Sequence, residues 1–272
     1  MPQISDIVRI IEQMAKPAYA YEWDNCGFAA GSLQDATARI LVTLDVTEDV
    51  ILEAKTKGCG MIVSHHPLIF KPIRTAAADT YEGRMLSLLY QNKIALYCAH
   101  TSLDIAPGGV NDALCGVLEL RNVGLFAPRE VCGELVACAR IGELPEKMQA
   151  SQLLRYIKKA IGAPSLLYGG LGDKVFEKMA LCTGAGEEFS FDAMQAGADV
   201  FLTGEIKYHT ALELKRRNLP FIAAGHFYTE WPVVGAFVRY LQKQLDVLQY
   251  KSMVFASEVH TDPFDVEGGF DK

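Results

Sequence analysis

Short apolar runs alternate with segments of helical periodicity along the first part of the chain. An apolar run over residues 39–46 is followed by an amphipathic segment over 48–58 and by a second apolar run over 59–67. This order of strand, helix and strand favours a parallel sheet with helices packed on its faces. A helical pattern over 81–92 and an apolar run over 93–100 continue the same order. The pattern predicts one doubly wound α/β half in this part of the chain.

A second module of the same kind is predicted after a change of texture near residues 122–145. Here β-like sequence lies between Pro128 and Pro145. An amphipathic helix over 150–161 follows, and beyond it apolar runs again alternate with helical segments. The chain is therefore predicted to be an α/β protein with largely parallel sheets flanked by helices.

Composition and charge narrow the class of protein. Half of the 272 residues are hydrophobic and 22% are charged, a balance typical of a folded globular chain. The formal net charge is −7 and the densest basic run covers only residues 215–217, so nucleic acid is not an expected partner. The sequence contains neither a long uncharged apolar run nor the apolar core of a signal peptide. We expect a soluble, cytoplasmic protein.

The cysteines point to the same compartment. The chain has 7 cysteines, an odd number, scattered among apolar neighbours and without a C-x-x-C pair. Neither a disulfide framework nor a zinc site built from thiolates is expected from this pattern. We expect free, buried thiols in a reducing environment.

Side chains that can bind metal follow three of the predicted strands. His65 and His66 come after one strand, and Asp104 comes after another. His226 and Glu230 follow the last predicted strand. In open α/β sheets the ligand crevice lies beyond the carboxyl ends of the strands, so these side chains are expected to converge. The sequence predicts a metal site on these five residues.

The spacing of the two adjacent histidines favours two metal ions over one. Neighbouring residues in an extended chain point to opposite sides, so His65 and His66 cannot easily face the same ion. A carboxylate has two oxygens, which makes Glu230 the expected bridge between the ions. Imidazole and carboxylate ligands without a thiolate suit Zn, Mn, Fe or Co, and the sequence does not choose among them.

The segment that carries His226 and Glu230 contains a helix start. The two residues have the i, i+4 spacing of a helical metal clamp. Pro232, however, does not belong inside a helix that already includes residue 228. We therefore expect the helix to begin with Thr229 as its N-cap and His226 to lie at the strand exit.

Each of these motifs also has an ordinary structural interpretation. A His-His-Pro step is often a plain loop, an aspartate before a Pro-Gly-Gly run is often a turn residue, and His226 with Glu230 could simply mark a helix start. The metal hypothesis depends on the three motifs occurring together at strand exits.

Four further residues are candidates for a role in substrate chemistry. His100 and His209 could line the same crevice and transfer protons, or they could bond the backbone within the core. Glu205 could transfer protons, support a ligand or cap a helix. Asn25, next to Trp23 and Asp24, could orient a substrate on an aromatic platform or form part of a turn.

Six motifs spread over nearly the whole chain resemble one known family. These are WDNCGF at 23–28, LVTLDVT at 41–47, IVSHHPLIF at 62–70, AHTSLD at 99–104, FLTGEIKYH at 201–209 and AAGHFYTE at 223–230. The chain resembles the Nif-three-like dinuclear-metal proteins, often labelled GTP cyclohydrolase I type 2 homologues. The resemblance places the metal ligands on His65, His66, Asp104, His226 and Glu230.

The resemblance also implies a domain organisation and an assembly. It implies two α/β domains, with the final segment returning to complete the first. With the boundary placed at the change of texture, the expected first domain covers residues 1–125 and about 222–272, and the second covers about 126–221. The resemblance implies a ring-shaped homohexamer with metal sites facing the interior. Some relatives carry a further domain between the two halves, which this chain is expected to lack.

Two hypotheses for the function follow. The first is a hydrolase with two divalent metal ions acting on a small nucleotide-like substrate, by GTP cyclohydrolase-type ring opening or by phosphoester hydrolysis. The second is a non-enzymatic metal-binding scaffold, metallochaperone or regulatory protein that binds other proteins. Neither hypothesis involves nucleic acid or a membrane.

Overall fold

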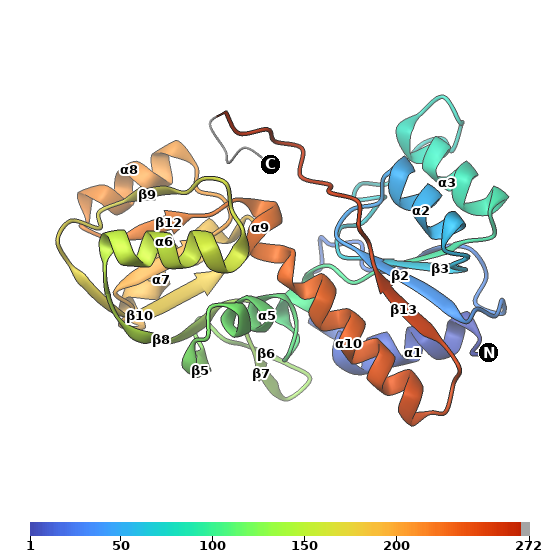
Figure 1. Cartoon of the computed structure of the whole chain (residues 1–272), viewed down its shortest axis with the longest axis horizontal. Helices are drawn as coiled ribbons and strands as arrows, with labels where there is room; N and C mark the ends of the chain where they lie inside the picture. Colours follow the sequence, from blue (N-terminus) through green and yellow to red (C-terminus); the bar gives the residue numbers. More distant parts are fainter. Residues whose placement is uncertain (268–272) are drawn as a thin grey trace. The chain divides into compact units, whose positions relative to one another are not determined.

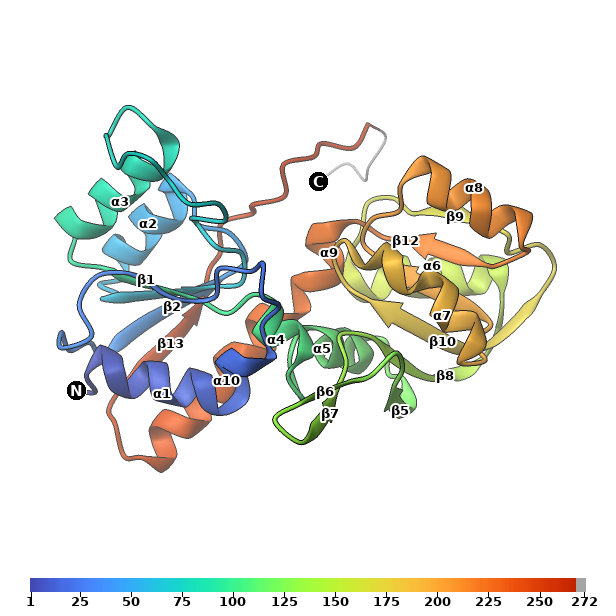
Figure 2. The same ribbon diagram turned by 180° about the vertical axis from the view of Figure 1, so that it is seen from behind.

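The computed structural model describes residues 1–267 of the chain (Figures 1 and 2). The chain divides into two compact units. The first unit contains Met1–Gly109 and Val234–Thr261, and the second contains Val110–Val233 and the described residues from Asp262 onward. Both units combine sheets with helices, so the predicted α/β class is confirmed.

The first unit is built on a five-stranded sheet with the order β1-β4-β3-β2-β13. Its strands are β1 (Gly27–Ala30), β2 (Arg39–Thr43), β3 (Met61–Ser64), β4 (Ala95–Cys98) and β13 (Met253–Ala256). All neighbouring strands are parallel except β1 and β4. The pairing of β13 with β2 brings the C-terminal part of the chain back to the first unit, as the resemblance implies.

Helices cover both faces of this sheet. Helices α2 (Glu48–Thr56) and α3 (Tyr81–Gln91) lie on one face, and α1 (Ile4–Met14) and α10 (Pro232–Val247) on the other (Figures 1 and 2). The strands explain this arrangement, because successive side chains of a strand point to opposite faces and every residue of β3 and β4 is buried. A 3₁₀ turn (Pro17–Tyr19) and the short helix α4 (Thr101–Ile105) complete the unit.

The second unit contains a six-stranded sheet with the order β5-β8-β10-β11-β12-β9 and a small hairpin. The sheet strands are β5 (Arg121–Leu125), β8 (Arg140–Gln149), β9 (Leu167–Gly169), β10 (Val175–Cys182), β11 (Val200–Thr203) and β12 (Phe221–Ala223), and the hairpin strands are β6 (Arg129–Val131) and β7 (Glu134–Val136). Strands β10, β11 and β12 are parallel, whereas β5, β8 and β9 join the sheet in antiparallel pairs. This sheet is therefore mixed. The sequence did not predict its antiparallel strands, because apolar runs indicate burial but not strand direction.

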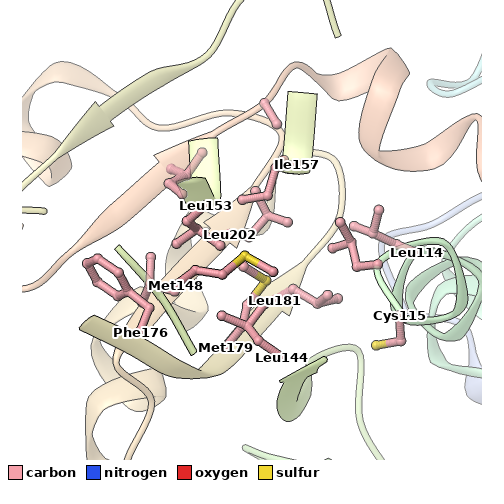
Figure 3. Packing of buried hydrophobic residues seen from close by; sticks show 14 of the residues in the cluster. Leu114, Cys115, Leu144, Met148, Leu153, Ile157, Phe176, Met179, Leu181 and Leu202 are labelled. Atoms are coloured by element: carbon pink, nitrogen blue, oxygen red, sulfur yellow. The ribbon is translucent and has the colours of Figure 1, made fainter. Parts of the chain in front are cut away.

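The helices of the second unit also lie on both faces of their sheet. They are α5 (Val110–Val117), α6 (Ala150–Ile161), α7 (Ser190–Gln195), α8 (Tyr208–Arg216) and α9 (His226–Glu230), with a 3₁₀ turn at Gly186–Phe189. Met179 and Leu181 of β10 pack with α5 and α6, as Figure 3 shows. The alternate residues Ala180 and Cys182 pack with α7 on the opposite face. The alternation along a single strand thus supports two separate apolar layers.

The boundaries of the units differ from the expected domains. Helix α5 contributes Leu114 and Cys115 to the core of the second unit, which places residues 110–125 there. Strand β12 pairs with β11, so the segment around residues 222–233 also belongs to the second unit. The expected boundary followed a change in sequence texture, which does not show which sheet a strand joins. The last five residues of the expected first domain, 268–272, lie outside the described part of the chain.

Among the described helices, none is both long enough and apolar enough to cross a membrane.

Leu202, on the central strand β11, tests the core of the second unit. Its side chain is fully buried in the layer under α6. We expect Leu202→Ala to lower the free energy of unfolding by about 2–5 kcal/mol, because it removes buried methyl groups and leaves a cavity. The measurement is urea unfolding followed by circular dichroism. Leu135→Ala, at a side chain that is 68% exposed, is the control and should change it by less than about 0.5 kcal/mol; equal effects of the two substitutions would contradict the packing described.

Candidate metal centre

Three parallel strands of the first unit end at the same edge of the sheet and deliver polar side chains there. Asp45 follows β2, His65 and His66 follow β3, and His100 and Asp104 follow β4. The backbone N–H of His65 donates to Thr43 O, so the alignment of β2 and β3 continues to the first histidine. Because parallel strands place their carboxyl ends together, these five side chains share one edge.

The imidazole rings at this edge of the sheet lie close enough to one another to bind a metal ion. The ring centroids of His65 and His66 are 4.9 Å apart, and His100 lies 5.2 Å from His65 and 5.6 Å from His66. Each ring offers a nitrogen, and these three nitrogens lie within 4.8 Å of one another. Asp104 contributes a carboxylate whose Oδ1 is 3.6 Å from His65 Nε2. The arrangement is suited to a cation that accepts imidazole and carboxylate ligands.

The Nδ1 atom of each of these histidines faces an oxygen. His65 Nδ1 lies 2.9 Å from Ala99 O, and His66 Nδ1 lies 2.8 Å from the carboxylate of Asp45. A carbonyl or carboxylate oxygen only accepts, so Nδ1 carries the proton and donates it. The lone pair is then on Nε2, which is the form of imidazole that binds a metal ion.

Asp24 holds the third histidine. It accepts hydrogen bonds from His100 Nδ1 at 2.8 Å and from the backbone N–H of Thr101 at 3.0 Å, and its side chain has no exposed surface. Burial raises the pKa of Asp24, but hydrogen bonds from His100, Cys26 and Thr101 outweigh that effect and leave the pKa well below its usual value. Asp24 is therefore a charged acceptor that fixes the orientation of His100.

The second unit repeats this arrangement on the parallel strands β10, β11 and β12. Glu205 follows β11, and His226 follows β12 as the first residue of α9. His226 Nδ1 lies 2.7 Å from Glu205 Oε1, while its Nε2 lies 3.2 Å from Glu230 Oε2. Glu230 is only 3% exposed. His226 and Glu230 belong to a group of side chains that could hold a metal ion. Both lie in the second unit, whereas His65, His66 and Asp104 lie in the first.

The carboxylate of Glu230 lies against the backbone that follows β10. A Cβ atom built on Gly184 would be 2.2 Å from Glu230 Oε1 and 3.0 Å from His226 Nε2. Gly184 also has φ +59°, and its N–H donates to Thr229 Oγ1 at 3.1 Å. Only glycine fits this position without moving the two predicted ligands.

The expected role of Thr229 as an N-cap is wrong. Helix α9 already begins at His226 and ends at Glu230, and α10 starts separately at Pro232. Proline is well tolerated in the first turn of a helix, so Pro232 begins a new helix and leaves the preceding turn intact. Thr229 instead accepts from Gly184 and donates back to backbone oxygen within α9.

The remaining predicted residues lie in different settings. Asn25 is exposed, and its side-chain amide donates to Ile69 O at 2.5 Å. His209 lies exposed in the first turn of α8, with its ring 5.4 Å from that of Tyr208. Among the described His, Cys, Asp and Glu residues, the groups of side chains that could hold a metal include His100 but not His209 or Glu205.

Sequence reasoning missed three residues that shape the site. It did not assign Asp45 or Asp24 as partners of histidine, and it did not single out Gly184. Asp45 follows a predicted strand in the same way as the ligands, so the strand-exit signal could have found it. Asp24 and Gly184 gave no such signal, because their roles depend on contacts between distant segments.

The sequence matches a known family over almost its full length. The model of the Duf34/NIF3 (NGG1p interacting factor 3) family matches residues 2–263. The chain belongs to this family. A Clostridium perfringens protein named GTP cyclohydrolase 1 type 2 homolog is 34% identical over 97% of this chain and 99% of its own length. A protein of the same name from Clostridium acetobutylicum is 32% identical over 96% of this chain and 98% of its own length.

Solved structures have the same fold as this member of the Duf34/NIF3 family. A Bacillus cereus protein related to NIF3 superimposes with a TM-score of 0.93 at 25% identity, covering 98% of this chain and 99% of that one. A hypothetical protein of Staphylococcus aureus gives 0.92 at 27% identity, covering 97% of this chain and 99% of that one. A Staphylococcus epidermidis relative aligns over 364 positions, so it contains segments that are absent from the 272 residues of this chain.

Replacing Gly184 should disturb the predicted ligands of the second unit. We expect Gly184→Ala to weaken metal binding, because the added Cβ displaces the carboxylate of Glu230. The measurement is metal content after dialysis against a weak chelator. Gly172→Ala is the matched control, since Gly172 has a similar φ of +53° but open space where the Cβ would be added. Equal metal loss in both variants would show that backbone strain, and not contact with Glu230, is responsible.

Removing Asp45 should loosen the orientation of His66. We expect Asp45→Ala to reduce metal affinity by about 10- to 100-fold, the usual effect of removing a carboxylate partner of a metal-binding histidine. The affinity is measured by competition with a chromogenic chelator. Asp49→Ala, at an exposed aspartate of α2, changes the net charge equally and should leave the affinity unchanged. An unchanged affinity in Asp45→Ala would contradict the role of Asp45 in orienting a metal-binding His66.

Proposed function

We propose that this protein is a hydrolase that depends on two divalent metal ions, held by His65, His66, Asp104, His226 and Glu230. The observation that carries the proposal is the orientation of the imidazoles, because each histidine at a strand exit has Nδ1 bonded to an oxygen acceptor. These hydrogen bonds fix each ring with its lone pair on Nε2. Fixing the rings costs conformational freedom, and it is the usual arrangement around metal-binding histidines.

The number of ligands supports a shared centre. The first unit offers His65, His66 and Asp104, and the second offers His226 and Glu230. A pair of ions requires more ligands than three or two side chains supply, so we propose that all five side chains serve as its ligands. Glu230 is the proposed bridge, because its carboxylate has two oxygens and is buried beside His226.

The proposed chemistry needs polarised substrate and activated water. Divalent ions would supply Lewis acidity, which lowers the pKa of water and polarises the bond that is cleaved. Glu205, 57% exposed, holds His226 and could exchange protons with solvent. His100, held by Asp24, is placed beside His65 and His66 and is the second candidate for proton transfer. His209 stays a prediction without a contact that supports it.

The name of the relatives suggests the type of substrate. They are named GTP cyclohydrolase 1 type 2 homologs, so a purine nucleotide is the first substrate to test, with ring opening by water as the reaction. Phosphoester hydrolysis requires the same ligands and is the alternative reaction. The family description as an NGG1p interacting factor favours a second candidate function, binding to another protein on a metal-bearing scaffold. Assembly into a homohexamer stays a prediction.

Metal content tests the proposal before any reaction is known. The protein is purified without added metal or chelating resin, and the metal per chain is measured by elemental analysis. We expect about two equivalents of a transition metal, largely lost in a His65→Ala/His66→Ala variant. His209→Ala should retain the metal. Less than one equivalent, unaffected by mutation and not restored by Zn, Mn, Fe or Co, would contradict the dinuclear site.

Turnover then separates the two candidate functions. Metal-loaded protein is assayed with purine nucleotides and phosphoesters, beside Glu230→Gln, which keeps the shape of the side chain but removes its charge. A hydrolase should lose at least about 10²-fold in kcat in this variant, in line with the loss of a group that acts in the transition state. Metal-loaded protein that turns over none of these compounds, with folding that depends on metal, favours the scaffold.

A further inference from the structure

Two aromatic side chains are exposed beside the histidines of the first unit. Trp23 is 60% exposed and Phe70 is 47% exposed. Their ring centroids are 6.0 Å apart, and each lies 6.3 Å from the ring of His100. Large aromatic surface left in water is unfavourable by about 25 cal/mol per Å². Its position next to a candidate metal ligand suggests that it contacts a ligand.

The three rings are steeply tilted against one another and form a corner. The planes of Trp23 and Phe70 meet at 64°, and the plane of His100 meets them at 73° and 81°. Tyr21 stacks on Trp23 with an interplanar angle of 11°. A flat ring placed in this corner could stack on one wall and meet the other edge to face, the two favoured geometries of aromatic contact.

Hydrogen bonds fix the corner relative to the histidines. Asp24, next to Trp23 in the chain, is bonded to His100 and to the backbone of Thr101. Asn25 donates to the carbonyl of Ile69, the residue before Phe70. Each exposed ring is therefore next in the chain to a hydrogen-bonded residue, which limits the backbone freedom that is lost when a ligand binds.

Two basic residues follow Phe70 in the chain. Lys71 and Arg74 are exposed on the same loop as Phe70. Among the described residues, neither has an ion-pair partner, although the chain carries a net charge of −7. Unpaired cations next to an aromatic platform match a ligand that combines a flat ring with a phosphate.

We propose that Trp23 and Phe70 form a base-stacking subsite, which selects substrates that contain a purine or similar planar heterocycle. The loop that carries Lys71 and Arg74 contacts the phosphate of the same molecule. This inference rests on the proposed function, because it places the base beside the metal-binding histidines. It adds the residues that recognise the substrate and excludes sugar phosphates without a base as good ligands.

Binding of three related compounds tests the subsite without any turnover. Dissociation constants of guanosine 5′-monophosphate, guanosine and ribose 5-phosphate are measured by isothermal titration calorimetry with the metal-loaded full chain. We expect the nucleotide to bind at least 10-fold more tightly than ribose 5-phosphate, because only the nucleotide has a base to stack. Equal binding of these two compounds, or no binding of the nucleotide, would overturn the proposal, and the second result would favour a protein as occupant.

Substitutions identify the contacts. Trp23→Ala should raise the dissociation constant of the nucleotide by about 5- to 150-fold, equivalent to ~1–3 kcal/mol of stacking, and leave that of ribose 5-phosphate unchanged. Trp23→Phe should restore most of the affinity, since it keeps a ring. Tyr90→Ala, at an aromatic residue of α3 that is also 60% exposed, is the matched control and should change neither value.

The phosphate contact has its own variant. Lys71→Ala/Arg74→Ala should weaken the nucleotide and ribose 5-phosphate alike and leave guanosine unaffected. Metal content is measured in every variant, which separates the two proposals. Full metal content with nucleotide binding that is insensitive to Trp23→Ala would overturn the subsite alone. Protein without metal that still binds the nucleotide through Trp23 would overturn the metal centre and leave the subsite standing.

Discussion

The alignment of three parallel strands is the constraint on which the first group of metal-competent side chains depends. Thr43 pairs with Ser64, and Ser64 pairs with Cys98, so β2, β3 and β4 end side by side. The residues that follow these strands then share one edge, although they are far apart in the sequence. A shift of one residue in either pairing would turn the side chains of that strand to the opposite face and move the histidines apart. The register of the sheet is therefore a condition for the chemistry.

The second unit achieves a related result with different residues. Its parallel strands β10, β11 and β12 are followed by Gly184, Glu205 and His226, and a single helical turn then adds Glu230. Position 184 must lack a side chain, because the backbone of Gly184 lies next to the carboxylate of Glu230. The match to the Duf34/NIF3 family covers both groups of side chains, since it extends over residues 2–263.

The sequence predicted the parts of this arrangement that depend on local pattern. Apolar runs located β2, β3 and β4, and the polar residues just beyond them identified the histidines. What it did not predict depends on contacts between distant segments. Asp24 bonds His100 across 76 residues, and β12 could be assigned to the second unit only from its pairing with β11. The helix at His226 was misjudged because Pro232 was expected to rule out a helical turn before it, whereas α9 ends at Glu230 and Pro232 begins a separate helix.

The four oriented histidines do not have the same partners. His66, His100 and His226 each donate to a carboxylate, whereas His65 donates to the neutral carbonyl of Ala99. A carboxylate draws the proton toward itself and makes the imidazole a stronger electron donor, and a carbonyl does so less. The imidazole of His65 is thus the weakest donor of the four. If metal ions bind here, His65 would therefore donate less electron density to its ion than His66 would to the ion that it holds.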